Sequence, residues 1–191
     1  MKVLITGTSE GIGKAIALKF LEKGHNVIGI DKEQATIENE LYTHIKKSIC
    51  DKDFPEIEGV EVLINNAGVQ ESGNDIDVNL KGTISITEKY GIQDKIKSII
   101  FIASASARTG AEFPEYVASK GGMVSYMKNV ALRIAQYGAT SNSISAGGVT
   151  TKLNEHIIND PILWQQVLDE TLLNKWASAE EIAEFAYFIA V

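Results

Sequence analysis

The sequence has few of the residues on which disulfide, zinc and nucleic-acid-binding proteins depend. Cys50 is the single cysteine in 191 residues, so neither an intrachain disulfide nor a cysteine-rich zinc site can form. His25, His44 and His156 lie far apart without metal-ligand spacing, and no metal site is expected. Acidic residues outnumber basic ones by 25 to 18, for a net charge of −7. This balance argues against nucleic acid or anionic membranes as partners, because both need a basic surface.

Long apolar runs are also lacking. None approaches the ~20 residues of a membrane span, and the N-terminus lacks the apolar core and cleavage site of a signal peptide. We therefore expect a cytoplasmic protein without a membrane partner. The chain has three prolines and no linker or repeat, and its length suffices to bury a core. Residues 1–191 are thus expected to form a single domain.

What the sequence does contain is an alternation of short, β-branched apolar runs with segments of helical spacing. Strands are predicted at Lys2–Thr6, Asn26–Ile30, Ile45–Cys50, Val60–Asn65, Ser98–Ser104 and Thr140–Ala146. Helices are predicted at Ile12–Lys23, Ile76–Lys89, Val117–Tyr137, Asp160–Leu173 and Ser178–Ala190, the last with Ser178 as its N-cap. This order predicts an α/β fold, a Rossmann-like doubly wound parallel sheet of about six strands with helices on both faces. Ligands of such sheets bind at the carboxyl ends of the strands.

A glycine-rich turn joins the first predicted strand to the first helix, over residues 6–13. In such a turn Gly7 permits a tight bend, Gly11 lets a ligand approach the backbone, and Gly13 lets the helix pack closely on the strand. The helix N-terminus then offers free N–H groups to a pyrophosphate. The position favours a dinucleotide site over the alternative, a glycine-rich turn without a ligand.

Asp31 closes the second predicted strand. An acid at this place hydrogen-bonds the adenosine ribose hydroxyls and repels a 2′-phosphate. Lys32 beside it would partly offset the repulsion. The sequence therefore favours NAD as the cofactor over NADP.

Further motifs follow the turn in order: Asn65-Asn66-Ala67-Gly68, Asn79, Ser104, Tyr116 with Lys120, and the segment 142–151. With Thr-Gly-x-x-x-Gly-x-Gly at the start, they resemble the short-chain dehydrogenase/reductase family from Lys2 to about Ala190. The resemblance implies an NAD(P)-dependent oxidoreductase acting on an alcohol or ketone. Ala146 replaces the family's usual proline. The strand with which family members normally end is not recognised before Val191, so the predicted strand Thr140–Ala146 should lie at the edge of the sheet.

The predicted catalytic residues are Asn79, Ser104, Tyr116 and Lys120. Tyr116 and Lys120 lie one helical turn apart, on one face, and a tyrosine can act as general acid/base although its ordinary pKa is about 10. The resemblance implies that Lys120 lowers the Tyr116 pKa and holds the nicotinamide ribose. It also implies that Ser104 hydrogen-bonds the substrate oxygen and that Asn79 holds a water, with a hydrogen bond to backbone as the alternative for Asn79.

Two other residue sets compete with these assignments. Ser106 is the main rival of Ser104. The resemblance favours Ser104, because the family's serine has the same spacing to the following glycine, here Gly110. Tyr42 and Lys46 repeat the Tyr-x-x-x-Lys spacing, but no strand-end serine precedes them. We interpret them as a solvated surface pair.

The resemblance also implies a set of cofactor contacts. Asp51 would contact the adenine, with a helix N-cap as the alternative, and Val149 and Thr151 would contact the nicotinamide carboxamide. The whole predicted set is Gly7, Ser9, Glu10, Gly11, Ile12, Gly13, Asp31, Asp51, Asn66, Ala67, Gly68, Tyr116, Lys120, Val149 and Thr151.

The segment Lys152–Trp176 resembles the family's substrate-covering region. Its apolar residues suit a hydrophobic substrate, but their helical spacing favours ordinary core packing. A homodimer is expected, or a homotetramer. The alternative function is a catalytically impaired NAD-binding regulatory or scaffold protein of the same fold. It is motivated by Ala146 in place of proline and by the family's last strand not being recognised in this sequence.

Overall fold

A computed structural model describes residues 1–191 and contains one six-stranded parallel sheet. Its strand order is β3-β2-β1-β4-β5-β6, which confirms the predicted doubly wound α/β fold and leaves β6 at an edge. The central strands β1, β4 and β5 are buried almost throughout, as their continuous apolar runs require. The strands are β1 Lys2–Thr6, β2 Asn26–Asp31, β3 Tyr42–Lys46, β4 Val62–Asn65, β5 Ser98–Ile102 and β6 Thr140–Ile144.

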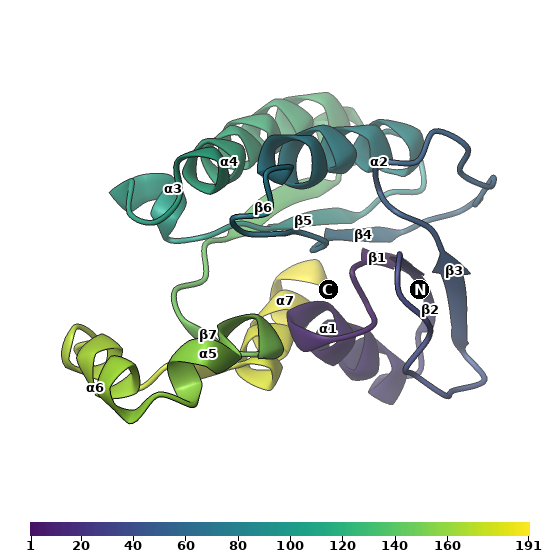
Figure 1. Ribbon diagram of the computed structural model, residues 1–191. Coiled ribbons are helices and arrows are strands. Elements are labelled where there is room, and N and C mark those ends of the chain that lie inside the picture. Colours follow the sequence, from purple (N-terminus) through teal and green to yellow (C-terminus); the bar gives the residue numbers. More distant parts are fainter.

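Helices cover both faces of this sheet (Figure 1). On one face lie α1 (Gly11–Glu22) and α7 (Ala179–Ala190), around a core that includes Phe20 and Ile64. On the other lie the π-helix η1 (Ile76–Gly82), α2 (Thr83–Tyr90) and α4 (Pro114–Ile134). The sheet is thus sealed from both sides, and ligands can reach it only at its edges. The remaining helices are α3 Ser106–Thr109, η2 Ala135–Tyr137, η3 Lys152–Asn154, α5 Glu155–Ile158 and α6 Pro161–Asp169.

Several predicted boundaries were wrong. The third strand was predicted at Ile45–Cys50 but begins at Tyr42 and ends at Lys46, because the chain then turns and the Asp51 carboxylate accepts a hydrogen bond from the Ser48 amide. The fifth strand ends at Ile102, since Ser104 enters the turn that leads into α3. The predicted helix 76–89 begins as a π-helix, and α4 begins at Pro114, ahead of Val117.

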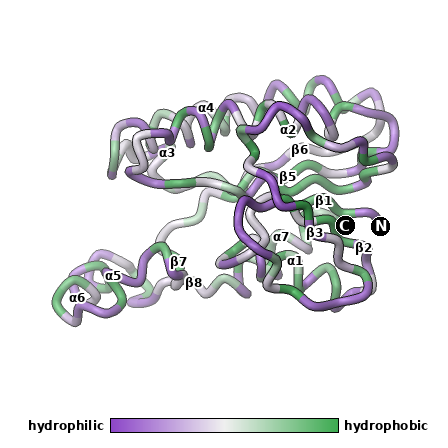
Figure 2. The backbone as a smooth tube through the Cα atoms, turned by 45° about the vertical axis from the view of Figure 1, so that its right-hand side comes forward, coloured by the Kyte–Doolittle hydropathy of each residue, from purple (hydrophilic) through white to green (hydrophobic).

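The segment between β6 and α7 is an arm, not a part of the core. Its elements α5 and α6 extend away from the sheet in Figures 1 and 2, and two short strands, β7 (Val149–Thr150) and β8 (Ala177–Ser178), pair at its base. No residue from 152 to 178 is buried; Ile162 is 71% and Leu172 100% exposed. The expectation of core packing for this segment was therefore wrong.

The end of the arm is defined by an N-cap. The Ser178 hydroxyl accepts from the Glu181 amide at 3.2 Å, and the Glu181 carboxylate accepts from the Ser178 amide at 2.9 Å. This capping box confirms Ser178 as the N-cap of the last helix.

None of the helices has both the length and the apolar character of a membrane span.

Candidate active site

The predicted site residues gather at one edge of the sheet. Gly7 follows β1, Asn66 follows β4 and Ser104 follows β5, and parallel strands bring their carboxyl ends to the same edge. The end of the arm closest to the sheet adds Thr151, whose methyl group would lie 3.7 Å from a Cβ at Gly11. Segments distant in sequence thus converge around the glycine-rich turn.

The turn itself requires its glycines. Gly7 and Gly11 have φ angles of +76° and +57°, in the left-handed region. A Cβ on Gly13 would lie 2.0 Å from the Gly7 carbonyl oxygen and 2.3 Å from Asn66 Nδ2. Asn66 in turn donates from Nδ2 to the carbonyls of Thr6 and Gly7, at 3.0 and 3.1 Å. The turn is therefore held against the end of β4 by the Asn66 side chain.

Asp31 lies beside this turn at the end of β2. Its Oδ2 accepts from the Ser9 amide and its Oδ1 from the Glu33 amide, both at 2.9 Å. Each oxygen keeps capacity to accept another hydrogen bond, for example from a hydroxyl. The predicted ribose acid and the predicted phosphate turn are thus in direct contact.

The remaining predicted cofactor residues vary in their surroundings. Glu10 is exposed and pairs with Lys152 at 3.4 Å, and Ile12 packs against the core of its face. The Ala67 amide donates to Thr6 Oγ1 at 3.0 Å, and the Thr151 amide to the Val149 carbonyl at 2.9 Å.

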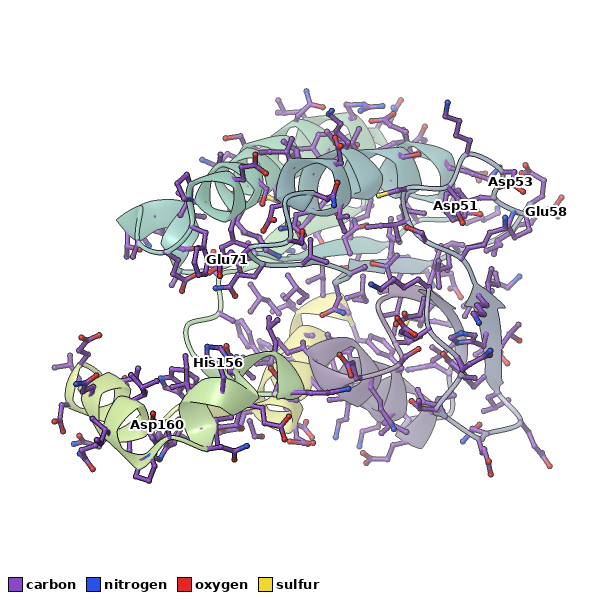
Figure 3. All side chains as sticks on the ribbon, in the orientation of Figure 1. Asp51, Asp53, Glu58, Glu71, His156 and Asp160 are labelled. Atoms are coloured by element: carbon purple, nitrogen blue, oxygen red, sulfur yellow. The ribbon has the colours of Figure 1, made fainter.

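Asp51 lies on the β3–β4 connection near Asp53 and Glu58 (Figure 3). No helix begins there, so the N-cap alternative for Asp51 was wrong. Its carboxylate instead caps the turn from Ser48. An adenine contact stays a prediction.

Tyr116 and Lys120 lie together at the start of α4. Lys120 Nζ is 5.6 Å from the centre of the Tyr116 ring and donates to the Ile102 carbonyl at 2.8 Å, so the lysine is tied to the end of β5. Ser104 is 7% exposed, and Ser106 Oγ donates to Ser104 Oγ at 2.8 Å. The Ser104 hydroxyl lies close enough to affect the Tyr116 pKa, which favours Ser104 over Ser106 as the partner of the phenol.

Asn79 is fully buried in η1 and holds neighbouring segments together. Its Nδ2 donates to the Val69 carbonyl at 2.8 Å and to Ser119 Oγ at 3.0 Å, while Oδ1 accepts from the Val69 amide at 2.7 Å. A Cβ on Gly68 would lie 3.1 Å from Asn79 Oδ1 and 3.4 Å from Lys120 Nζ. Asn79 thus positions the loop after β4 beside Lys120. The water that Asn79 was predicted to hold stays a prediction.

Comparisons with known proteins agree with this geometry. The family model for short chain dehydrogenases matches residues 1–161. The chain belongs to this family. It is 30% identical over 218 residues to the 3-oxoacyl-[acyl-carrier-protein] reductase FabG of Buchnera aphidicola subsp. Acyrthosiphon pisum, covering 97% of this chain and 88% of that protein.

Solved structures share the fold. A short chain dehydrogenase family protein from Francisella tularensis subsp. tularensis SCHU S4 superposes with a TM-score of 0.85 at 26% identity, covering 100% of this chain and 90% of that one. A 4-hydroxyisoleucine dehydrogenase complexed with NADH superposes with a TM-score of 0.90 at 23% identity and the same coverage. As a short-chain dehydrogenase, this protein is an NAD(P)-dependent oxidoreductase.

The electrostatics of this short-chain dehydrogenase site differ from the expectation. Burial raises the pKa of Tyr116; the Ser104 hydroxyl lowers it, and the carboxylates of Glu112 and Asp75 raise it further. The expected lowering of the Tyr116 pKa by Lys120 is not seen. Lys120 is itself buried, and burial lowers its pKa to about 8. Desolvation therefore controls both groups in the free protein.

The low pKa of Lys120 predicts a pH-dependent stability. Between pH 8 and 10.5 the unfolded chain binds more protons at this lysine than the folded chain does, so the free energy of unfolding should rise with pH through that window. Lys120→Met removes this contribution. Denaturant unfolding at several pH values measures the free energy of unfolding of both proteins. The difference in this free energy between wild type and variant should change by about 3 kcal/mol across the window. Parallel curves would contradict a buried, titrating Lys120.

Three residues at or near the glycine turn, Thr8, Tyr42 and His44, were not predicted from the sequence. Tyr42 is half-buried on β3, and its hydroxyl lies 2.7 Å from Thr8 Oγ1 and 2.9 Å from His44 Nδ1. The interpretation of Tyr42 as part of a solvated surface pair was therefore wrong, whereas Lys46 is exposed. The available signal was the Tyr-x-His spacing, which puts both side chains on one face of a strand.

Proposed function

We propose that the protein transfers a hydride between NAD(H) and a secondary alcohol or ketone, with Tyr116 as the general acid/base. The observation that carries this proposal is the placement of Tyr116 and the buried Lys120 at the sheet edge that also holds the glycine turn. Hydride transfer needs proton transfer and dinucleotide binding within one site, and this placement supports such a site.

The residues present fit a nicotinamide dinucleotide. The glycine turn presents backbone where a Cβ cannot be placed, and Asp31 beside it can accept from ribose hydroxyls. When bound, the nicotinamide supplies the hydride or accepts it. Asp31 supports NAD as the partner because a carboxylate there opposes a 2′-phosphate.

The protonation states favour the direction of ketone reduction. The raised pKa keeps Tyr116 protonated at neutral pH, and a protonated phenol can donate to the oxygen of a ketone as that oxygen gains negative charge. The Ser104 hydroxyl supplies a second donor to this oxygen. Lys120, whose pKa is about 8, then returns a proton to the phenolate and regains one from water.

The arm supports a substrate with an apolar body. Its exposed apolar side chains include Leu153 and Leu163. Because the FabG relative is named as a 3-oxoacyl-[acyl-carrier-protein] reductase, 3-oxoacyl thioesters are a first substrate class to test.

The test of the function combines binding with turnover. NADH and NADPH are titrated separately, and nicotinamide absorbance is then followed across a panel of ketones, alcohols and 3-oxoacyl thioesters. We expect tighter binding of NADH and turnover of a ketone. Binding of NADH without turnover of any panel member would instead favour the regulatory or scaffold role.

Cofactor choice is expected to depend on Asp31. Asp31→Asn keeps the size of the side chain and removes the charge that opposes a 2′-phosphate, so the dissociation constant of NADPH should fall by about tenfold or more while that of NADH rises. Calorimetric titration of both cofactors measures this. Glu33→Gln is the matched control, since it removes a nearby exposed charge. An equal gain in NADPH affinity from both variants would show that the loss of any nearby negative charge favours NADPH, and would reject specific recognition of the ribose by Asp31.

A further inference from the structure

A chain of hydrogen bonds runs from the glycine turn across the sheet edge. Thr8 Oγ1 lies 2.7 Å from Tyr42 Oη, Tyr42 Oη lies 2.9 Å from His44 Nδ1, and His44 Nε2 lies 2.9 Å from the Glu33 carbonyl. It thus links the glycine turn after β1, strand β3 and the loop that follows β2.

Asp31 closes this chain into a ring. Its carboxylate accepts from the Glu33 amide and from the Ser9 amide, both at 2.9 Å, and Ser9 adjoins Thr8. The ring therefore contains both elements predicted to receive the adenosine half of the cofactor, the turn and the ribose acid. Its members are Thr8, Ser9, Asp31, Glu33, Tyr42 and His44.

The direction of these bonds follows from their chemistry. The Glu33 carbonyl can only accept, so His44 Nε2 donates to it. In a neutral imidazole Nδ1 is then the acceptor, and it receives the Tyr42 proton. The Tyr42 oxygen in turn accepts from the Thr8 hydroxyl. Tyr42 is thus the one member with both a donor and an acceptor role through a single atom.

The space around the Tyr42 hydroxyl is made by a glycine. A Cβ on Gly29 of β2 would lie 2.3 Å from Tyr42 Oη and 2.3 Å from Thr8 Oγ1. Thr8 is fully buried, so its side chain has no access to solvent as an alternative partner. The absence of a side chain at Gly29 therefore allows the Thr8 and Tyr42 hydroxyls to form their hydrogen bond next to β2, the strand that ends at Asp31.

We propose that Tyr42, through His44, is a positioning residue that holds Asp31 and the glycine turn in the arrangement that selects the adenosine ribose. The inference rests on the proposed function, because it concerns how the same site chooses between NADH and NADPH. Tyr42 contacts no cofactor itself; it acts by fixing the loop at Glu33 and the turn at Thr8.

The test is Tyr42→Phe, which deletes one hydroxyl and breaks two links of the ring. We expect the dissociation constant of NADH to rise by about tenfold, as for loss of one to two hydrogen bonds. That of NADPH should stay within about twofold of wild type, because weaker repulsion between a displaced Asp31 and the 2′-phosphate offsets the loss at the glycine turn, which both cofactors share. The kcat at saturating NADH should be unchanged. The matched control is Tyr137→Phe, which removes the hydroxyl of a tyrosine that is 36% exposed and lies beyond α4. It should alter neither constant.

Two further variants separate positioning from a merely structural role. His44→Leu breaks the same ring at another residue and should give the same selective loss for NADH, so it decides the question if Tyr42→Phe fails to fold. In an Asp31→Asn background, Tyr42→Phe should have no further effect on the preference between the cofactors.

The results that overturn the inference are distinct from those that overturn the function. An unchanged ratio of NADH to NADPH affinity in the Tyr42 and His44 variants, with or without a lower melting temperature, would reject the positioning role. A wild-type protein that binds neither cofactor would reject the proposed function itself, and this inference with it.

Discussion

Replacing Tyr116 by phenylalanine is expected to lower kcat by about a thousandfold, within the range that general acid catalysis contributes. The Tyr116 phenol, next to Ser104, is the proposed source of the proton that passes to the substrate oxygen. Phenylalanine removes this proton but keeps the ring that lies near Lys120. The dissociation constant of NADH should therefore change by no more than about threefold. Single-turnover kinetics and a separate binding titration measure the two effects.

Tyr126→Phe provides the matched control on the same helix. Its hydroxyl donates to Glu88 at 2.7 Å, on the side of α4 that faces α2, outside the site. Its loss should cost about 1 kcal/mol of stability and leave kcat unchanged. Turnover that survives in Tyr116→Phe would remove Tyr116 from the proposed role.

Gly13→Ala is expected to destabilise the protein by about 3 kcal/mol, at the upper end for one added methyl group in a packed region. The added Cβ would lie 2.0 Å from the Gly7 carbonyl oxygen, a backbone atom that cannot rotate away. For a chain of this length that loss lowers the melting temperature by about 10 °C. Because α1 must then move from the turn, NADH affinity should fall as well.

Gly121→Ala is the comparison that isolates close packing from helix propensity. Gly121 is also helical, but its nearest neighbour would lie 3.9 Å from an added Cβ. This variant should gain about 0.5–1 kcal/mol, because alanine loses less conformational entropy than glycine in a helix. Thermal unfolding of the two variants should thus move in opposite directions. Equal melting temperatures would show that the turn and α1 do not pack as described.

Much of the site was predictable because its signals are local. Gly7, Gly11 and Gly13 lie within one turn whose conformation needs them, and Tyr116 and Lys120 lie one turn apart on a helix. Apolar runs such as Leu63 and Ile64 in β4 predicted buried parallel strands. The positions of these residues at one edge then followed from the rule that parallel strands share their carboxyl ends.

Contacts between distant segments were not predictable in the same way. Tyr42 reaches Thr8 only because β3 pairs with β2, with Tyr42 opposite Val27, and because Gly29 has no side chain to block the Tyr42 hydroxyl. The Asn79 side chain donates to Val69 and Ser119, which lie 10 and 40 residues from it along the chain. Neither contact has a sequence pattern of its own.

The sequence by itself determined the α/β architecture, the dinucleotide turn and the candidate catalytic pair, because each depends on residue types at short spacings. The tertiary structure alone decided the raised pKa of Tyr116, the lowered pKa of Lys120 and the exposure of the arm from 152 to 178. Those properties depend on how much water each side chain loses and which charges remain near it. Burial and charge placement arise only when separate segments pack, so helical spacing alone could not distinguish an exposed arm from a core helix.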